Sequence, residues 1–254
     1  MLANLFIGSL IILYAMGLMV CAVYCRIQKR STRKMYGLVV AASQRPEALE
    51  EQSRKTENSD GAKCGAKAIL RKMRKHMEPY LYGLTRYLVI VVGKIPSCRI
   101  RKWIMRHVFC MEISKDAVLY GGFEIRSPWN VKIGRAVIGL GALIDGRMSV
   151  SIEDDVVLAS SVSIYTVQHD VDDPMFRVNN KGGSVVIHNH AWISSHSTVL
   201  PKVEVGEGAV LCSGAIATKS LEPFGIYSGI PATKKRERNH NLEYVSGKTY
   251  WHFY

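Results

Sequence analysis

Cysteine is scarce and unpatterned in this sequence, and motifs that read nucleic acids are missing. The 254 residues include six cysteines, which form no CxxC pair and no dense framework. Reduced thiols are therefore the simpler interpretation, and they agree with a cytosolic domain, where disulfides are rare. No recognised nucleic-acid-binding motif accompanies the basic and aromatic residues, so we expect no nucleic-acid partner.

Charge is absent from the first apolar run, Leu2–Cys25. As a helix this run spans ~36 Å, which is enough to cross a hydrocarbon core of ~30 Å. A cleaved signal peptide is the competing interpretation, but no basic segment precedes the run and the run is long for a signal peptide. Basic residues at 26–34 follow directly, and the positive-inside rule then places the remaining chain in the cytoplasm. We expect a single-pass anchor at 2–25 in the cytoplasmic membrane, with the remaining domain facing the cytoplasm.

Positive charge is concentrated between this anchor and residue 110. Residues 26–110 carry 20 Lys and Arg against 6 Asp and Glu, whereas residues 111–254 carry 14 against 15. We interpret 26–63 as a basic juxtamembrane segment and flexible linker, because residues 43–63 are polar and lack apolar periodicity. The pattern at 64–110 predicts amphipathic basic helices. These helices either lie on the anionic membrane surface or cover the end of the following domain.

Small or apolar residues recur every six positions in the second half of the chain. Six is neither the helical period of 3.6 nor the strand period of two, so it predicts a repeated turn around a continuous core. We therefore expect a mainly β domain at 111–235, a parallel hexapeptide β-helix, followed by a tail at 236–254. The inward series is Ile187, Ile193, Val199, Val205, Leu211 and Ala217, and a second series two positions earlier is Val185, Ala191, Ser197, Val203, Ala209 and Ala215.

The six-residue period is less regular upstream, where steps of five and eight residues interrupt it. At three hexads per turn, about five turns fit between Ile113 and Ile226 once one long interruption is set aside. The sequence leaves two registers open, one through Ile133, Ile138 and Ile144, and one through Val131, Val137 and Leu143.

The long interruption falls between Ile164 and Val185 and contains His169 and Asp170. A loop that leaves a regular solenoid is where function usually resides. His169 is the best candidate for a general base, because an imidazole titrates near physiological pH and can take a proton from an attacking hydroxyl. Taken alone, a histidine in a loop is more often an ordinary surface residue.

Three stretches carry a more specific signal: SIYTVQHDVDD at 163–173, AWISSHSTVLPKVEVGEGAVLCSGAIATKS at 191–220, and YSGIPA at 227–232. Together they resemble the hexapeptide-repeat O-acyltransferases that modify polysaccharides and small acceptors. The resemblance covers roughly residues 111–235, about half of the chain. Upstream, GKIPSCRIRKWIMRHVF and GGFEIRSPWNVKIG are similar to the entry of this domain in membrane-associated polysaccharide O-acetyltransferases.

This resemblance implies a left-handed parallel β-helix, a homotrimer, and acetyl-CoA bound in clefts between subunits. His169 then matches the catalytic histidine, and Asp170 matches the acid after it, which orients the imidazole or binds the acceptor. Candidate substrate-binding residues are Tyr165, Trp192 and His196. Candidate residues for binding acetyl-CoA are Ser194, Ser213, Gly214, Thr218, Lys219, Gly229, Pro231, Ala232 and Lys234.

Several of these assignments have an alternative. Trp192 either forms a wall of the site or packs in the interior, and His196 either extends the site or faces solvent. Lys234 either meets the CoA phosphates or belongs to a solvated charge run. Ser194 stands where the family usually has glycine.

The histidines also raise a metal hypothesis, since some similar β-helix enzymes hold zinc with three histidines and hydrate carbon dioxide. Residues 18 apart stack on one face of such a helix, whereas His190 and His196 are six apart and project from different faces. We therefore expect no metal. A non-catalytic trimeric scaffold at the membrane is the other alternative, and the looped-out His169 counts against it.

Together these features predict an O-acetyltransferase anchored in the membrane. We expect it to move an acetyl group from acetyl-CoA to a sugar hydroxyl during synthesis of a surface polysaccharide or glycolipid. The saccharide acceptor is lipid-linked on this interpretation, because such intermediates present their sugars at the same membrane surface. A soluble nucleotide sugar is the alternative acceptor.

Overall fold

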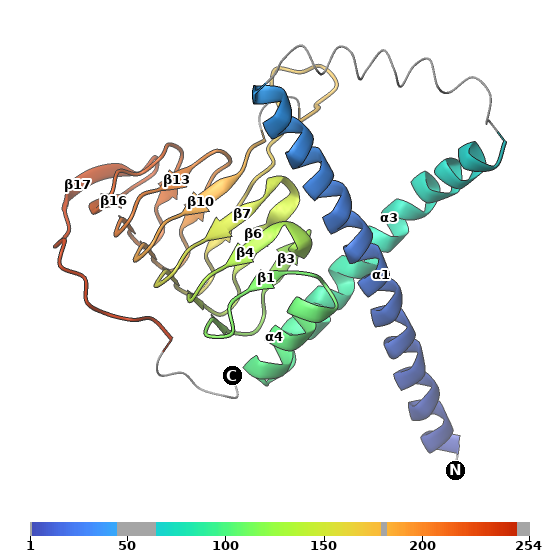
Figure 1. The fold of residues 1–254 in the computed structure, drawn as a ribbon. Helices are drawn as coiled ribbons and strands as arrows, with labels where there is room; N and C mark the ends of the chain where they lie inside the picture. Colours follow the sequence, from blue (N-terminus) through green and yellow to red (C-terminus); the bar gives the residue numbers. More distant parts are fainter. Residues whose placement is uncertain (1, 45–64, 179–181, 248–254) are drawn as a thin grey trace. The chain divides into compact units, whose positions relative to one another are not determined.

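The structure, a computed structural model, describes residues 2–44, 65–178 and 182–247 (Figure 1). Two compact units divide the chain, Met1–Thr85 and Arg86–Tyr254. The flexible linker predicted up to residue 63 lies outside the described residues from position 45 onward.

The first unit is helical. Helix α1 (Leu2–Gln44) continues past the predicted end of the anchor at Cys25, so the basic residues that follow extend the same helix. Among the helices described, only α1 has a segment long and apolar enough to cross a membrane, at Ile12–Arg33. This segment meets the length and composition that the predicted anchor requires. Helix α3 (Gly65–Gly93) is the first of the predicted basic helices, and its Met73 and Met77 are exposed.

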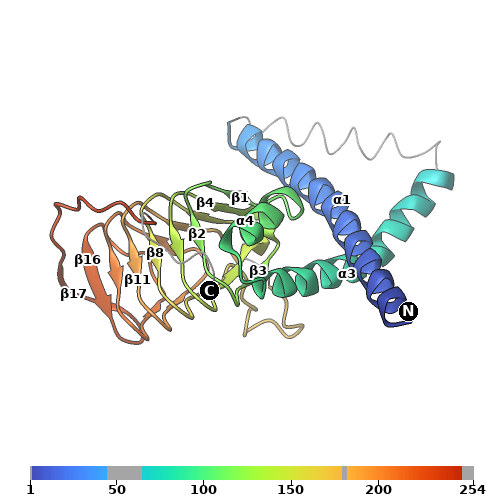
Figure 2. The ribbon, with the colours of Figure 1, turned by 90° about the horizontal axis from the view of Figure 1, so that it is seen from below.

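The second unit contains a parallel β-helix of about six turns whose strands form three flat faces. Face 1 is visible in Figure 1 and face 2 in Figure 2. Face 1 comprises β1 (Glu112–Ile113), β4 (Val131–Ile133), β7 (Val150–Ile152), β10 (Val185–Ile187) and β13 (Glu204–Val205). Face 2 comprises β2 (Val118–Leu119), β5 (Val137–Ile138), β8 (Val157–Leu158), β11 (Trp192–Ile193), β14 (Val210–Leu211), β16 (Gly225–Ser228) and the antiparallel β17 (Thr233–Glu237). Face 3 comprises β3 (Glu124–Arg126), β6 (Leu143–Asp145), β9 (Ser163–Ile164), β12 (Thr198–Val199) and β15 (Ile216–Ala217).

The inward positions predicted from the sequence are confirmed by the register of these strands. On face 2, Ile138, Leu158, Ile193 and Leu211 stack in successive turns, and all four are buried. The second apolar series, from Val185 to Ala215, is also buried. One continuous column of aliphatic side chains therefore fills the interior and stabilises the stacked turns.

Short 3-10 helices explain the eight-residue steps upstream. Helices η1 (Pro128–Asn130) and η2 (Gly146–Met148) lie in successive turns at the corner between faces 3 and 1, where each lengthens its turn by two residues. Of the two registers left open, the one through Ile133, Ile138 and Ile144 is correct. In the rival register Val137 and Leu143 are only half-buried, and Val131 belongs to the second buried series. The turns number about six, close to the five expected, as the parallel strands of face 2 from β2 to β16 show.

Helix α4 (Cys98–His107) caps the open end of the β-helix at its first turn. Arg101 is buried and donates through Nε and Nη2 to the carbonyl of Leu119, at 3.2 and 2.8 Å, and through Nη1 to that of Ile95. Lys102 donates to the carbonyls of Lys115 and Ala117, at 2.7 and 2.6 Å. The covering interpretation therefore holds for these two cations, whose charged groups bind carbonyls instead of a membrane surface.

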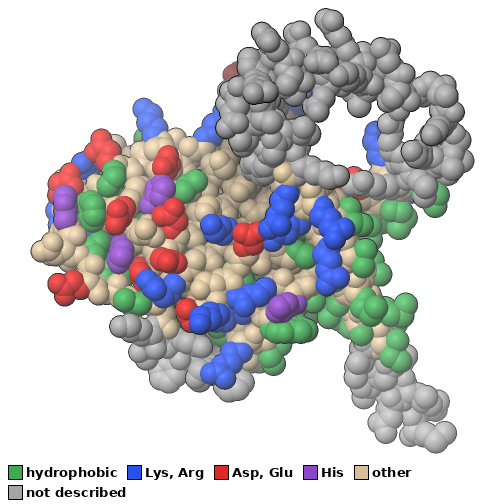
Figure 3. Space-filling view, in the orientation of Figure 1, with side chains coloured by type: hydrophobic (Ala, Val, Ile, Leu, Met, Phe, Trp, Pro, Cys, Tyr) green, Lys and Arg blue, Asp and Glu red, His purple; other side chains and the backbone are tan. Residues whose placement is uncertain are grey.

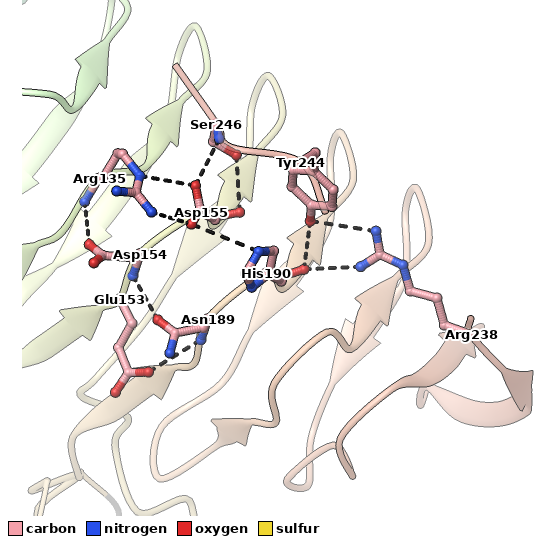
Figure 4. A network of polar contacts seen from close by, with 9 residues as sticks. All are labelled: Arg135, Glu153, Asp154, Asp155, Asn189, His190, Arg238, Tyr244 and Ser246. Carbon is pink, nitrogen blue, oxygen red and sulfur yellow. Dashed lines mark hydrogen bonds and ion pairs between the residues drawn. The ribbon is translucent and has the colours of Figure 1, made fainter. Parts of the chain in front are cut away.

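The segment after β17 returns along the corner between faces 1 and 2 and ties several turns together (Figure 4). We call residues 238–247 the strap. Arg238 donates to the carbonyls of His190 and Gly208, both at 3.0 Å, and the Tyr244 hydroxyl donates to that of His190 at 2.9 Å. Farther along, Ser246 bonds Asp155 through its backbone N–H, at 2.8 Å, and through its hydroxyl, at 3.1 Å.

Asp155 anchors the strap from a buried position. Its carboxylate also accepts two bonds from Arg135, at 3.1 and 2.5 Å. Burial alone would raise the pKa of Asp155, but the bonds from Arg135 and Ser246 outweigh burial and hold the pKa below its ordinary value. The carboxylate therefore stays ionised in the folded state, and the tail predicted at 236–254 begins as an ordered part of the domain.

Candidate active site

The loop with His169 leaves the β-helix at the corner that holds η1 and η2. It follows β9 on face 3 and returns to face 1 at β10. Each of the two preceding turns is already lengthened at this corner, so the loop is the longest of three successive insertions. The predicted interruption of the repeat is thereby confirmed as a surface loop.

His169 is exposed, and its ring is held by Phe176 of the same loop. Its Nδ1 lies 2.6 Å from the carbonyl oxygen of Phe176, and the two rings stack with centroids 4.4 Å apart and planes 3° apart. A carbonyl oxygen can only accept, so Nδ1 carries the proton in this contact. In the neutral form of the ring with this contact, Nε2 is the unprotonated nitrogen, which is the atom that a general base uses.

Asp170 stabilises the backbone of the loop. Its backbone N–H donates to the carbonyl of Arg177 at 2.8 Å, and its carboxylate accepts the N–H of Asp172 at 3.2 Å. The guanidinium of Arg177 in turn pairs with Asp173 at 2.7 Å. Since Phe176 is the acceptor for Nδ1, the structure gives that orienting contact to a carbonyl instead of to Asp170.

The other predicted site residues fall on three different parts of the β-helix surface. Trp192 projects from face 2 with 45% of its surface exposed, which rules out the interior packing role. Tyr165 is half-buried at the start of the His169 loop. Thr218 and Lys219 are exposed where β15 ends, at the same corner of the helix as that loop. Lys234 lies on β17 of face 2, and the remaining candidates lie at the corner between faces 2 and 3.

That corner is a column of exposed backbone and small side chains. The Ser213 hydroxyl and the Gly214 N–H both donate to the carbonyl of Ser195, at 2.7 and 3.1 Å. His196 is exposed one residue farther along, with a positive φ of 59°. Gly229 and Pro231 are exposed in the turn after β16, and the Ala232 N–H donates to the carbonyl of Ile216 at 2.8 Å.

Two of the predicted cofactor-binding residues, Ser194 and Lys234, are engaged by neighbouring residues in this structure. Ser194 is buried at 8% exposure, and its backbone carbonyl accepts the Ser197 hydroxyl, so little of this residue faces solvent. Lys234 is engaged by the carboxylates of Glu222 and Glu237, at 2.7 and 2.6 Å. The bond to Glu222, followed by that to Glu237, raises the pKa of Lys234 well above its ordinary value. A phosphate would have to compete with both carboxylates for this ammonium group.

Sequence reasoning missed two polar clusters of the β-helix. On face 1, His188 lies between Glu153 and Glu204, with its Nδ1 3.1 Å and its Nε2 2.6 Å from their carboxylates. The bond to Glu204, aided by Glu153, raises the pKa of His188. Figure 3 shows acidic and histidine side chains interspersed on this side of the molecule, over the later turns. The second cluster is the pair Asp145 and Arg147 at the base of the His169 loop. Its one sign in the sequence is an aspartate directly after the inward Ile144.

Within the described ranges, no group of three or more histidine, cysteine, aspartate or glutamate side chains is arranged to hold a metal ion. His190 lies at the corner between faces 1 and 2, where its Nε2 is 3.8 Å from Asp155, whereas His196 lies at the corner between faces 2 and 3. These two histidines therefore project from different corners of one chain, as their spacing in the sequence predicts.

Known proteins similar to this chain are acetyltransferases. A galactoside O-acetyltransferase of Escherichia coli is 31% identical over 124 residues, which are 48% of this chain and 61% of that protein. A probable macrolide acetyltransferase of Lysinibacillus sphaericus is 37% identical over 73 residues, 28% of this chain and 41% of that protein. The chain thus matches less than two thirds of the length of either relative. No protein-family model matches it.

The fold is that of hexapeptide-repeat acetyltransferases. A Vibrio cholerae member, crystallised with acetyl coenzyme A, superposes with a TM-score of 0.53 at 20% identity, covering 69% of this chain and 92% of that one. The left-handed parallel β-helix implied by the sequence resemblance is thereby confirmed.

Proposed function

The repeat domain has the fold, and in part the sequence, of the hexapeptide-repeat acetyltransferases, and from this premise we propose that the chain transfers an acetyl group from acetyl-CoA to a sugar hydroxyl. The observation that carries the proposal is the contact between His169 Nδ1 and the Phe176 carbonyl. It leaves Nε2 as the basic atom of an exposed imidazole, on a loop that interrupts an otherwise regular solenoid.

In the proposed reaction, His169 Nε2 takes the proton of the acceptor hydroxyl as its oxygen attacks the thioester carbonyl. A backbone N–H at the edge of a turn stabilises the negative charge that develops on the carbonyl oxygen. The C–S bond then breaks, the ester remains on the sugar, and the CoA sulfur leaves with the proton held by the imidazolium. No covalent enzyme intermediate forms.

The distribution of site residues supports a site shared between copies of the chain. His169, Trp192 and the Ser213–Gly214 corner belong to different sides of one β-helix. In a single chain these groups therefore face solvent on different sides of the β-helix. In a homotrimer, the loop of one copy meets the face 2 side of its neighbour and encloses acetyl-CoA in a cleft between them.

The acceptor proposed here is a saccharide carried at the cytoplasmic face of a membrane, in the synthesis of a surface polysaccharide or glycolipid. The similarity to a galactoside O-acetyltransferase supports a sugar hydroxyl. The apolar segment of α1 supports the location, because Met16, Met19 and Val20 are exposed along it. Its basic continuation supports a cytoplasmic orientation.

We expect membranes that contain the full chain to incorporate labelled acetyl from acetyl-CoA into their glycolipid or polysaccharide fraction. The measurement is extraction and separation of these fractions after incubation, with membranes lacking the chain as the control. Absence of label with folded protein and acceptor-rich membranes would contradict the proposed activity and favour a non-catalytic scaffold.

Full-length protein should stay in the membrane pellet after washing with alkaline carbonate. Arginines placed at Met16 and Val20 each add about 2.5 to 3.5 kcal/mol to the cost of insertion, so the double variant should appear in the supernatant. Immunoblots of the two fractions measure the result. Release of the unaltered chain would show that α1 does not anchor it.

A further inference from the structure

The base of the His169 loop rests on a carboxylate that the proposed reaction does not use. The side chain of Asp145, at the end of β6, has no exposed surface. Arg147 donates to it through Nε at 2.9 Å, through Nη2 at 2.8 Å, and through its backbone N–H at 3.2 Å. Burial alone would raise the pKa of Asp145, but the bonds from Arg147 outweigh burial and lower it. The carboxylate therefore remains charged and fixed in place.

Thr166, three residues before His169, joins Asp145 to both ends of the loop, chiefly through the backbone carbonyl of Asp145. Its buried hydroxyl donates to the backbone carbonyl of Asp145 at 2.7 Å and accepts the Met148 N–H at 3.0 Å. Its backbone N–H lies 3.4 Å from the Asp145 carboxylate. Where the loop returns, the Gly183 N–H donates to the Thr166 carbonyl at 2.9 Å.

The returning segment also approaches Thr166 closely at Gly182. A Cβ at Gly182 would lie 3.1 Å from the Thr166 carbonyl oxygen and 3.4 Å from a side-chain carbon of Met148. The two ends of the loop thus lie close together beside the Asp145–Arg147 pair. A shift of Thr166 would be transmitted along the few residues that separate it from the imidazole.

Farther out, the loop is held by its own contacts. The bond from Asp170 to Arg177 and the pair between Asp173 and Arg177 close its outer part, which contains the carbonyl that accepts from His169. These contacts hold the imidazole to the outer part of the loop, and the bonds of Thr166 at the base join the loop to the β-helix.

We propose that Asp145 is a positioning residue that acts through Thr166 to place His169 at the corner of the β-helix between faces 3 and 1. The inference rests on the proposed acetyl transfer only for its kinetic consequence. The geometric consequence, a fixed Nδ1–H form of the His169 ring, is independent of any activity.

The chain supplies a matched control in Asp155. Both aspartates are buried at corners of the β-helix, with side-chain exposures of 0% for Asp145 and 5% for Asp155. Each pairs with an arginine of similar exposure, 39% for Arg147 and 38% for Arg135. Asp155 holds the strap, whereas Asp145 holds the loop. Asparagine at either position removes one buried charge, so a merely structural role predicts the same outcome for both variants.

The test compares full-length Asp145→Asn and Asp155→Asn with the unaltered chain. We expect Asp145→Asn to lower kcat by about 10- to 100-fold while the KM for acetyl-CoA changes less than about twofold, since small misplacements of a catalytic group have effects of this size. Asp155→Asn should show a comparable fall in thermal midpoint with nearly unchanged kcat. Equal kcat for the two variants at equal stability would overturn the proposal.

Nitrogen NMR of the His169 ring gives the second readout, with His169→Ala identifying the signal. The unaltered chain and Asp155→Asn should show the Nδ1–H form, and Asp145→Asn a mixture of both tautomers. An unchanged ring spectrum in Asp145→Asn would overturn the positioning role of Asp145. If the spectrum changes but the unaltered chain shows no acetyl transfer, the positioning role stands and the proposed function is rejected. If Asp145→Asn fails to fold, Thr166→Val tests the same connection at its other end, because it removes the hydroxyl that binds the Asp145 backbone carbonyl and keeps the Asp145–Arg147 pair.

Discussion

His169→Ala should lower the rate of acetyl transfer by about 10² to 10⁴, the range that a general base typically contributes. The effect should fall on kcat, because the imidazole acts on the acceptor hydroxyl as the bond to the acetyl carbon forms. Binding of acetyl-CoA should persist, since the Ser213–Gly214 corner lies on another part of the β-helix. Kinetics with the purified chain and isothermal titration with CoA measure the two quantities.

The structure supplies a suitable control in His107, which is exposed on α4 and belongs to no part of the proposed site. His107→Ala should retain the kcat of the unaltered protein. The folded state of His169→Ala is checked by its thermal midpoint, which should change little because the His169 side chain is exposed. Full activity in that variant would remove His169 from the mechanism and with it the main support for acetyl transfer.

Arg101→Ala should destabilise the β-helix domain by about 3 kcal/mol or more. The substitution leaves the carbonyls of Leu119 and Ile95 without their guanidinium donor, and each buried unpaired acceptor costs about 1 to 3 kcal/mol. A cavity where the aliphatic stem lay adds to the loss. For a domain of this size the thermal midpoint should fall by about 6 to 12 °C. Differential scanning fluorimetry of the purified chain gives the value.

Arg99→Ala is the matched variant for this prediction. Arg99 lies two residues earlier on the same helix with its side chain in solvent, so its loss should change stability by less than about 0.5 kcal/mol. A similar, small effect of both substitutions would show that α4 does not cap the β-helix through Arg101. A large effect confined to Arg101→Ala would establish the covering role of this basic helix.

The inward positions of the β-helix could be predicted from the sequence because the residues of that series occupy equivalent buried positions in every turn. Ile187, Ile193 and Val199 differ by six positions and all face the interior, so the period alone identifies them. The upstream register needed the structure, since η1 and η2 add residues at a corner without changing the apolar pattern that follows. A corner is solvent-facing, and many polar sequences fit it.

For the candidate site, the sequence predicted the loop and its histidine, because both interrupt the six-residue repeat. The Nδ1 contact with Phe176 was not predictable, because it depends on how the loop folds back over seven residues. Burial of Ser194 and the double ion pair of Lys234 also depend on neighbouring turns. Likewise, the bond between Asp155 and Ser246 joins positions 91 residues apart, and no local pattern predicts such a contact.

The strap also bears on the order in which the domain is completed. In a solenoid each turn contacts only its neighbours, so the turns can stack one after another as synthesis delivers them. Within the strap, Ser246 bonds Asp155, and Gly247, the last residue described, lies against Asp116 of the first turn. The nascent domain therefore passes through a stage in which every turn has formed and this seam is still open. During that interval the corner between faces 1 and 2 is exposed to chaperones and proteases, and closure of the seam ends that exposure.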